Sequence, residues 1–170
     1  PDSSLTHMVM GIADAFGTAP ARFFVTPDAV DVEGAIAALA ALDSPAFVVA
    51  TSFALVHVLD RLVAPLSLPA GTVLVETGGF KGRSREVDRP SLHDAIVGKL
   101  GVSPVSIVGE YSMTELSSQL WENVHDPMAT TLDARRYVPP PWCRVVAVDP
   151  ETLRPMPPGE VGLLRFVDLA

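Results

Sequence analysis

The sequence has little cysteine and little positive charge. Its one cysteine, Cys143, cannot form an internal disulfide, and no charged segment followed by an apolar run opens the chain, so a reducing, cytoplasmic location is expected. The 12 Lys and Arg against 20 Asp and Glu give a net charge of -8. Proteins that bind a nucleic-acid backbone normally carry a basic face, so no nucleic-acid partner is expected. Any nucleotide is expected as a small ligand.

Long apolar runs are also missing. Pro, Gly, Asp or Arg interrupts every hydrophobic stretch before it reaches the ~20 residues that cross a bilayer, so no membrane span is predicted. Of the 170 residues, 48% are nevertheless apolar, which is enough for the core of a globular domain. The chain starts at Pro1 without a methionine and stops inside an apolar run, residues 166–170, so we expect a fragment truncated at both ends.

Apolar runs of strand length alternate with helical patterns along the first three quarters of the chain. The expected strands are residues 22–25, 47–51, 72–77 and 105–108. The expected helices begin near residues that can cap a helix N-terminus, namely Ser3 or Ser4, Asp31, Ser52, Ser91 and Thr114. Such alternation is typical of parallel βαβ units. We predict an α/β fold, with an open, mostly parallel sheet and flanking helices.

The pattern changes near the end of the chain. Residues 144–149 and 161–168 are rich in β-favouring residues and are separated by a turn-forming segment with several prolines, which predicts an antiparallel β hairpin with a long loop. We therefore predict an α/β nucleotide-binding subdomain over residues 1–135 and the start of a β-rich subdomain over residues 136–170.

The segment Tyr111-Ser-Met-Thr-Glu115 follows a predicted buried strand, where open α/β sheets bind ligands. If a helix begins at Thr114, its free N–H groups and dipole favour an anion such as phosphate. Glu115 would add a hard oxygen ligand for Mg²⁺, and Tyr111 an aromatic face for a base. An ordinary helix cap explains the same residues equally well.

A second polar segment, Gly78-Gly79-Phe80-Lys81-Gly82-Arg83-Ser84, also follows a predicted strand. Paired glycines allow close approach to a ligand, and two basic residues suit an anion. The segment matches neither of the glycine-rich phosphate-binding motifs GxxxxGK[ST] and GxGxxG. A plain basic turn is the favoured interpretation.

Other polar residues have plainer explanations. Cys143 follows three prolines and a tryptophan and precedes a strand, which favours a structural thiol. The residues 135–137, Arg-Arg-Tyr, are expected as a solvated turn. The four histidines are dispersed and lack metal-ligand spacing, so no metal site other than a nucleotide-associated magnesium is predicted.

Three segments in order, ETGGFKG, GEYSMTELSSQ and PPGEVGLLRFVDLA, resemble the adenylate-forming superfamily of acyl-CoA synthetases, luciferases and peptide-synthetase adenylation domains. Within it they are most similar to the lux-type acyl-protein synthetases, also called long-chain-fatty-acid luciferin-component ligases. The superfamily motif is aromatic-Gly-x-Thr-Glu. Ser112 stands here in place of the glycine, a departure that is expected to disturb the backbone turn mildly.

The resemblance implies ATP or AMP and Mg²⁺ as cofactors and assigns roles to matching residues. It implies that Thr114 contacts the AMP phosphate, Glu115 holds magnesium and Tyr111 stacks on adenine. The other residues implied to bind nucleotide are Gly78, Gly79 and Phe80 beside adenine and the acyl carbonyl, Glu110 as acceptor for the adenine amino group, and Ser112 and Met113. Ser52 and Phe53 are implied to lie near the acyl pocket.

The implied activity is formation of acyl-AMP from a long-chain fatty acid and ATP, followed by acyl transfer to a thiol of a protein or carrier, with reductase or transferase subunits as partners. The superfamily's phosphate loop, ribose-binding Asp, hinge and Lys-bearing C-terminal domain have no match here, and Asp168 comes too early to be the ribose Asp. The fragment is therefore expected to be inactive alone. Two alternatives stay open: an aryl- or phenylacetate-type acyl-CoA ligase, and a catalytically incomplete module that binds nucleotide or acyl chain.

Overall fold

The computed structural model describes residues 4–26, 29–79, 82 and 84–170. Phe80 and Lys81, both singled out in the sequence, lie outside the described residues, as do Ser3 and Arg83. The α-helices are α1 (Ser4–Phe16), α2 (Val32–Ala40), α3 (Ser52–Arg61) and α4 (Arg89–Leu100). The strands are β1 (Phe47–Thr51), β2 (Val73–Thr77), β3 (Ile107–Tyr111), β4 (Leu120–Glu122), β5 (Tyr137–Val138), β6 (Cys143–Val148) and β7 (Leu163–Asp168).

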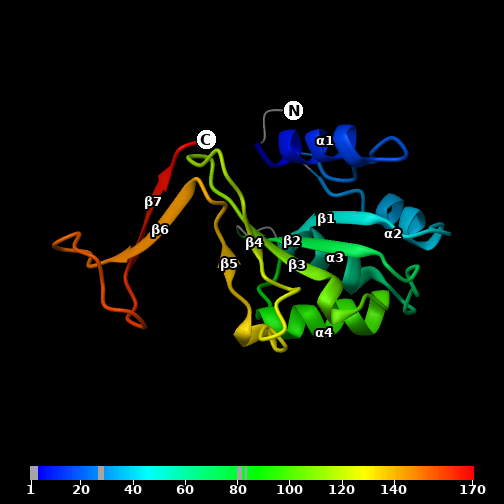
Figure 1. Ribbon diagram of the computed structural model, residues 1–170. Coiled ribbons are helices and arrows are strands. Elements are labelled where there is room, and N and C mark those ends of the chain that lie inside the picture. Colours follow the sequence, from blue (N-terminus) through cyan, green and yellow to red (C-terminus); the bar gives the residue numbers. More distant parts are fainter. Residues whose placement is uncertain (1–3, 27–28, 80–81, 83) are drawn as a thin grey trace.

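A five-stranded sheet forms the centre of the molecule, in the order β1-β2-β3-β4-β5. The pairs β1–β2 and β2–β3 are parallel, whereas β3–β4 and β4–β5 are antiparallel. The predicted fold class is thus confirmed, with the antiparallel strands added at one edge. The other predicted feature, a β6–β7 antiparallel hairpin, forms a second sheet, and Figure 1 shows it on the opposite side of the molecule from α2.

The hydrophobic core lies between the five-stranded sheet and helices α3 and α4 (Figure 1). The parallel strands contribute Leu74 and Ile107, each fully buried, and α4 contributes Ile96. Because side chains alternate along a strand, Glu76 and Gly109 lie on the same face as these core residues, nearer to the carboxyl ends of β2 and β3. The core therefore ends in a polar layer beneath the loops that leave the sheet.

The helix caps differ from the prediction at two places. Ser52 is the first residue of α3, and Thr51 occupies the N-cap position. The Ser52 hydroxyl does not cap the helix but donates to the buried carboxylate of Glu76. Asp88 caps α4 by accepting from the amide of Ser91, the residue expected as the cap. Capping by Asp31 at α2 is confirmed.

Two predicted elements are wrong. Residues 22–25 form no strand, since Val25 makes only an isolated bridge to Val30. No helix begins at Thr114: the amide of Leu116 bonds to the Met113 carbonyl at 3.0 Å, which closes a tight turn, and the chain then returns as β4 beside β3. A cap-like Thr-Glu pair suits a turn as well as a helix start, and here the antiparallel pairing decides. No helix in the described part of the chain is long and apolar enough to cross a membrane.

Candidate functional site

The carboxyl ends of β1, β2 and β3 meet at one edge of the sheet, as their parallel pairing requires. Thr51, Thr77 and Glu110 are paired in register across the three strands. The Gly78–Gly79 segment therefore leaves the sheet beside the segment that begins at Ser112. The structure brings together the two loops that the sequence singled out separately, at the edge where open α/β sheets bind ligands.

Glu110, at the carboxyl end of β3, is 1% exposed. Both of its carboxylate oxygens are buried, and neither has a hydrogen-bond partner among the described residues. An unsatisfied buried carboxylate costs several kcal/mol as a rule, and so it is rare unless a ligand, ion or proton satisfies it. Glu110 is thus the strongest mark of a binding function in the described chain.

Tyr111, the predicted base platform, already contacts two aromatic rings. The ring of Phe166 stacks on it, with centroids 6.1 Å apart and an interplanar angle of 11°. Tyr137 lies at 5.9 Å with a tilt of 53°. A base can take the stacked face of Tyr111 only in place of Phe166.

Thr114 and Glu115 occupy the two central positions of the Met113–Leu116 turn, and both are exposed. The anion site predicted from a helix N-terminus is therefore absent from this turn. Ser112 fits without backbone strain, because Leu153 is the one non-glycine residue with a positive φ in the described part of the chain. The turn presents a hydroxyl and a carboxylate to solvent beside Glu110.

The amides that follow this turn are used by the β6–β7 hairpin. Asp168 Oδ2 accepts from the amides of Ser117 and Ser118 at 3.0 and 2.9 Å, and its Oδ1 accepts from the Ser118 hydroxyl at 2.8 Å. Trp142 Nε1 donates to the same hydroxyl at 2.9 Å. These contacts attach the hairpin to residues 109–119, which we call the nucleotide segment.

A buried ion cluster lies beneath the loops, and the sequence analysis missed it. Arg89 Nη1 contacts Glu122 Oε1 at 2.7 Å, and its Nε lies 3.5 Å from Glu76 Oε2. Glu122 Oε2 accepts from the Gly109 amide at 2.9 Å and lies 3.4 Å from Arg135 Nη1. We call Glu76, Arg89, Glu122 and Arg135 the buried ion cluster. It connects β2, β3 and β4 to the start of α4.

Burial, charges and hydrogen bonds in the buried ion cluster shift the pKa values of Glu122, one of its members, and of the neighbouring His93. Burial opposes ionisation of Glu122, but the hydrogen bonds from Arg89 and the Gly109 amide outweigh it and lower the pKa of the carboxyl. Burial, aided by the charges of Arg89 and Arg135, lowers the pKa of His93 to about 4. His93 is therefore neutral at physiological pH, and its Nε2 is buried without a partner among the described residues.

Several predicted residues lie elsewhere. Ser52 and Phe53 are both buried in α3, and the Ser52 hydroxyl is used by Glu76. Arg135 is not in a solvated turn: its side chain is 6% exposed and donates to the Ile107 carbonyl at 2.8 Å. Cys143 is buried, and burial raises the pKa of its thiol, with the Asp168 charge adding to the effect, so the thiol is a poor nucleophile.

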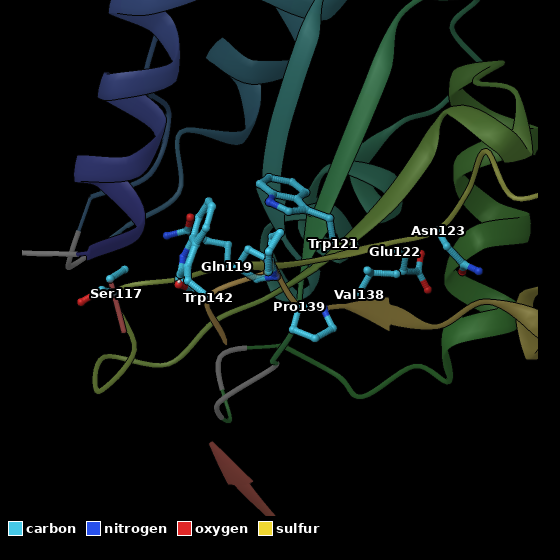
Figure 2. A pocket seen from close by; sticks show the side chains of 12 residues that line it. Ser117, Gln119, Trp121, Glu122, Asn123, Val138, Pro139 and Trp142 are labelled. Carbon is cyan, nitrogen blue, oxygen red and sulfur yellow. Dashed lines mark hydrogen bonds between the residues drawn. The ribbon is translucent and has the colours of Figure 1, made fainter. Parts of the chain in front are cut away.

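A hollow of about 620 Å³ lies beyond the nucleotide segment. Figure 2 shows Trp142 close to Ser117 and Gln119, with Trp121 and Pro139 farther along. Its lining is mostly apolar and includes neither Thr114 nor Glu115. The hollow therefore reaches Ser117 and Ser118 at the end of the segment but not the Thr114–Glu115 turn.

Sequence reasoning had only weak signals for the buried ion cluster. Glu76 stands inside an apolar strand pattern, VLVET, where a charge is unexpected, and this could have marked it as a buried group with a partner. Arg89 and Arg135 are 46 positions apart and each has polar neighbours, so both resemble surface residues. Only the fold brings them to the same carboxylate.

Comparison with known proteins identifies the family that this sequence resembles. A family model described as acyl-protein synthetase, LuxE, matches residues 25–170. A long-chain-fatty-acid–luciferin-component ligase of Aliivibrio fischeri is 27% identical over 97 residues, which are 56% of this chain and 23% of that protein. The aligned part thus covers about a quarter of the relative's length.

Proposed function

The chain belongs to the LuxE acyl-protein synthetase family, and on that premise we propose that it forms the nucleotide-binding wall of an ATP-dependent ligase. The ligase would activate a long-chain fatty acid as acyl-AMP and pass the acyl group to a thiol of a protein or carrier. The name of the Aliivibrio fischeri relative, a long-chain-fatty-acid–luciferin-component ligase, supports the acid class. The single observation that carries the proposal is the buried Glu110 carboxylate at the carboxyl edge of the sheet, which has no hydrogen-bond partner among the described residues.

The residues around Glu110 suit an adenine nucleotide. A carboxylate in a dry site binds an exocyclic amino group strongly, since the alternative is an unsatisfied buried acceptor. Tyr111 would supply the aromatic face for the base once Phe166 leaves it. Gly78 and Gly79 would let the backbone approach the ligand closely. Gly79 has a φ of 112°, a backbone angle that residues with a side chain rarely adopt. Phe80, outside the described residues, stays a prediction.

The turn fits the remaining roles. The Thr114 hydroxyl is exposed and would donate to the phosphate, and the exposed Glu115 carboxylate would hold magnesium. One carboxylate suits this ion, because Mg²⁺ usually keeps several waters and shares the substrate's phosphates. When bound, the ion would neutralise phosphate charge. Ser112 and Met113, at the start of the same turn, would also contact the nucleotide. Ser52 and Phe53, at the start of α3 just after β1, would lie near the acyl group.

Catalysis by these residues would be positional and electrostatic. Holding a carboxylate in line with the α-phosphate can replace much of the entropy cost of a bimolecular encounter. Donors fixed beforehand stabilise developing charge without reorganising. The proposed donor, the Thr114 hydroxyl, follows a sheet edge that the buried ion cluster connects to α4.

Acid-dependent exchange between ATP and pyrophosphate tests the proposal in the intact parent protein. We expect the parent protein to catalyse this exchange with a long-chain fatty acid, and we expect Glu115→Ala to abolish it. Glu160→Ala is the matched control, because Glu160 is also an exposed glutamate and lies in the loop between β6 and β7. An unchanged rate of exchange in Glu115→Ala would contradict the assignment of this turn.

The thiol acceptor separates the two enzyme candidates. Transfer to a protein thiol supports an acyl-protein synthetase, whereas transfer to CoA supports an aryl- or phenylacetate-type ligase. If the chain is part of an acyl-protein synthetase, reductase or transferase subunits would be its partners. A cytoplasmic location is proposed from the single, buried cysteine, since disulfides mark oxidising compartments.

A further inference from the structure

Strand β7 presents an aromatic ring and a carboxylate to the proposed nucleotide segment. Phe166 stacks on Tyr111, and Asp168 accepts three hydrogen bonds from Ser117 and Ser118. The two residues are two positions apart in β7, so their side chains leave the same face of the strand. We call these interactions together the hairpin contact.

The donors that hold Asp168 form an organised anion site. Two successive backbone amides and a hydroxyl converge on one carboxylate, at distances of 2.8 to 3.0 Å. Ser118 is 4% exposed, and its hydroxyl accepts from Trp142 Nε1, which orients its hydrogen toward the anion. Convergent amides of this kind bind phosphate as readily as carboxylate.

Asp168 is ionised in this contact. Burial opposes its charge, but the hydrogen bonds from the Ser118 hydroxyl and from the amides of Ala170, Ser118 and Ser117 outweigh burial, so the pKa of Asp168 is lowered. The carboxylate therefore presents a full negative charge to the site at neutral pH.

We propose that the Ser117 and Ser118 amides and the Ser118 hydroxyl are a binding site for a phosphate group of the nucleotide, and that Phe166 and Asp168 hold this site and the Tyr111 face closed while the hairpin is docked. The inference rests on the proposed function and adds its regulation. Phe166 stands in for the base and Asp168 for the phosphate. A nucleotide must displace the hairpin contact to bind.

The consequence is a lowered apparent affinity. When only a fraction of the molecules has the hairpin undocked, the dissociation constant rises in inverse proportion to that fraction. An undocked fraction of about one tenth would weaken binding about tenfold. Removing the hairpin contact should recover the lost affinity by the same factor, without any new interaction with the ligand.

Titration of AMP into the full 170-residue chain tests the inference. The variants are Phe166→Ala, Asp168→Ala and the double variant. Leu164→Ala and Asp149→Ala are matched controls, because Leu164 lies on the same face of β7 and Asp149 accepts hydrogen bonds only within its own turn. We expect the double variant to bind AMP about tenfold more tightly than the natural chain and the controls.

Adenosine, which lacks the phosphate of AMP, separates the contribution of Phe166 from that of Asp168. Phe166→Ala should help both ligands, whereas the gain from Asp168→Ala should be larger with AMP than with adenosine, because only AMP has a phosphate to take the donors that Asp168 leaves free. Amide spectra of α3 and α4 verify that each variant keeps the core fold. Unchanged or weaker AMP binding in the double variant, beside measurable binding by the natural chain, would overturn the inference and leave the proposed function standing. AMP binding by none of the variants would overturn both.

Discussion

Gly109 lies where three polar side chains converge on the sheet. A Cβ at this position would lie 2.7 Å from Arg89 Nη2, 2.7 Å from the Tyr137 hydroxyl and 2.9 Å from Glu122 Cδ. All three distances are shorter than real Cβ contacts. The glycine therefore allows the buried ion cluster to approach the backbone of β3, immediately before Glu110 and Tyr111.

Substitution of Gly109 should be costly in spite of its small size. We expect Gly109→Ala to lower the free energy of unfolding by about 2 kcal/mol, since overpacking a filled interior costs about 1 to 3 kcal/mol. Gly98→Ala is the matched control: Gly98 is exposed in α4 with no atom within 4 Å of an added Cβ. It should stabilise the chain by about 1 kcal/mol through helix propensity. Equal effects in a denaturant titration would contradict this account.

His93 makes stability depend on pH. Its pKa is lowered from 6.5 to about 4 in the folded chain, where the charges of Arg89 and Arg135 face it, opposed by Glu122 and Asp94. Between these two values the unfolded chain binds a proton and the folded chain does not, so the free energy of unfolding falls as the pH falls. The contribution is fully present above pH 6.5 and is lost progressively down to about pH 4.

The expected size is about 1.4 kcal/mol for each pH unit. Urea titrations between pH 6.5 and 5 should show a weaker pH dependence of the free energy of unfolding for His93→Gln than for the natural chain. The variant lacks the one proton that His93 takes up on unfolding. His125→Gln, an exposed loop substitution, should leave it unchanged. A variant with the same pH slope as the natural chain would show that His93 is not buried in its neutral form.

At the scale of elements, Arg89 joins helix α4 to strands β2 and β4. Its partners Glu76 and Glu122 have side chains 7% and 1% exposed, whereas Arg89 itself is 32% exposed. Removing a charge from a buried pair leaves the partner unpaired in a poorly solvated place. The buried ion cluster thus fixes the strand ends from which both proposed nucleotide loops leave.

We expect Arg89→Ala to destabilise the chain by about 3 kcal/mol, at the lower end of the range for a broken buried pair because Arg89 is partly exposed. Arg85→Ala removes an exposed bidentate pair with Asp60, whose contacts are 2.9 and 2.7 Å, and should change stability little. Thermal unfolding of both variants checks the difference. Similar losses would place the two ion pairs in equivalent environments and contradict the description of the cluster.

The elements differ in how far the sequence predicts them. FVVAT and VLVET form β1 and β2 within a residue of the prediction, because continuous apolar runs are typical of parallel strands, although β1 is an edge strand and only β2 is buried. The segment after Thr114 was predicted as a helix, because a Thr-Glu pair fits a cap and a turn equally well. Only pairing of β4 with β3 decides between them. The buried ion cluster depends on residues far apart in sequence, and no local pattern encodes it.

At the scale of the whole molecule, two sheets meet at the proposed nucleotide segment. The five-stranded sheet carries Glu110 and Tyr111, and the β6–β7 hairpin reaches the segment through Phe166, Asp168 and Trp142. A division of the chain at residue 135 stays a prediction. The segment therefore lies where movement of one sheet relative to the other changes its accessibility.

The central claim is that an adenine nucleotide binds between the two loops at the carboxyl ends of β2 and β3. Titration of AMP with Mg²⁺ into the isotope-labelled chain, followed by amide chemical shifts, tests it most directly. We expect the largest shifts at Gly78, Gly79, residues 110–118 and the end of β7 that carries Phe166 and Asp168, and none in α2. Shifts confined to the hollow beside Trp121 and Trp142, or spread evenly over the chain, would contradict it.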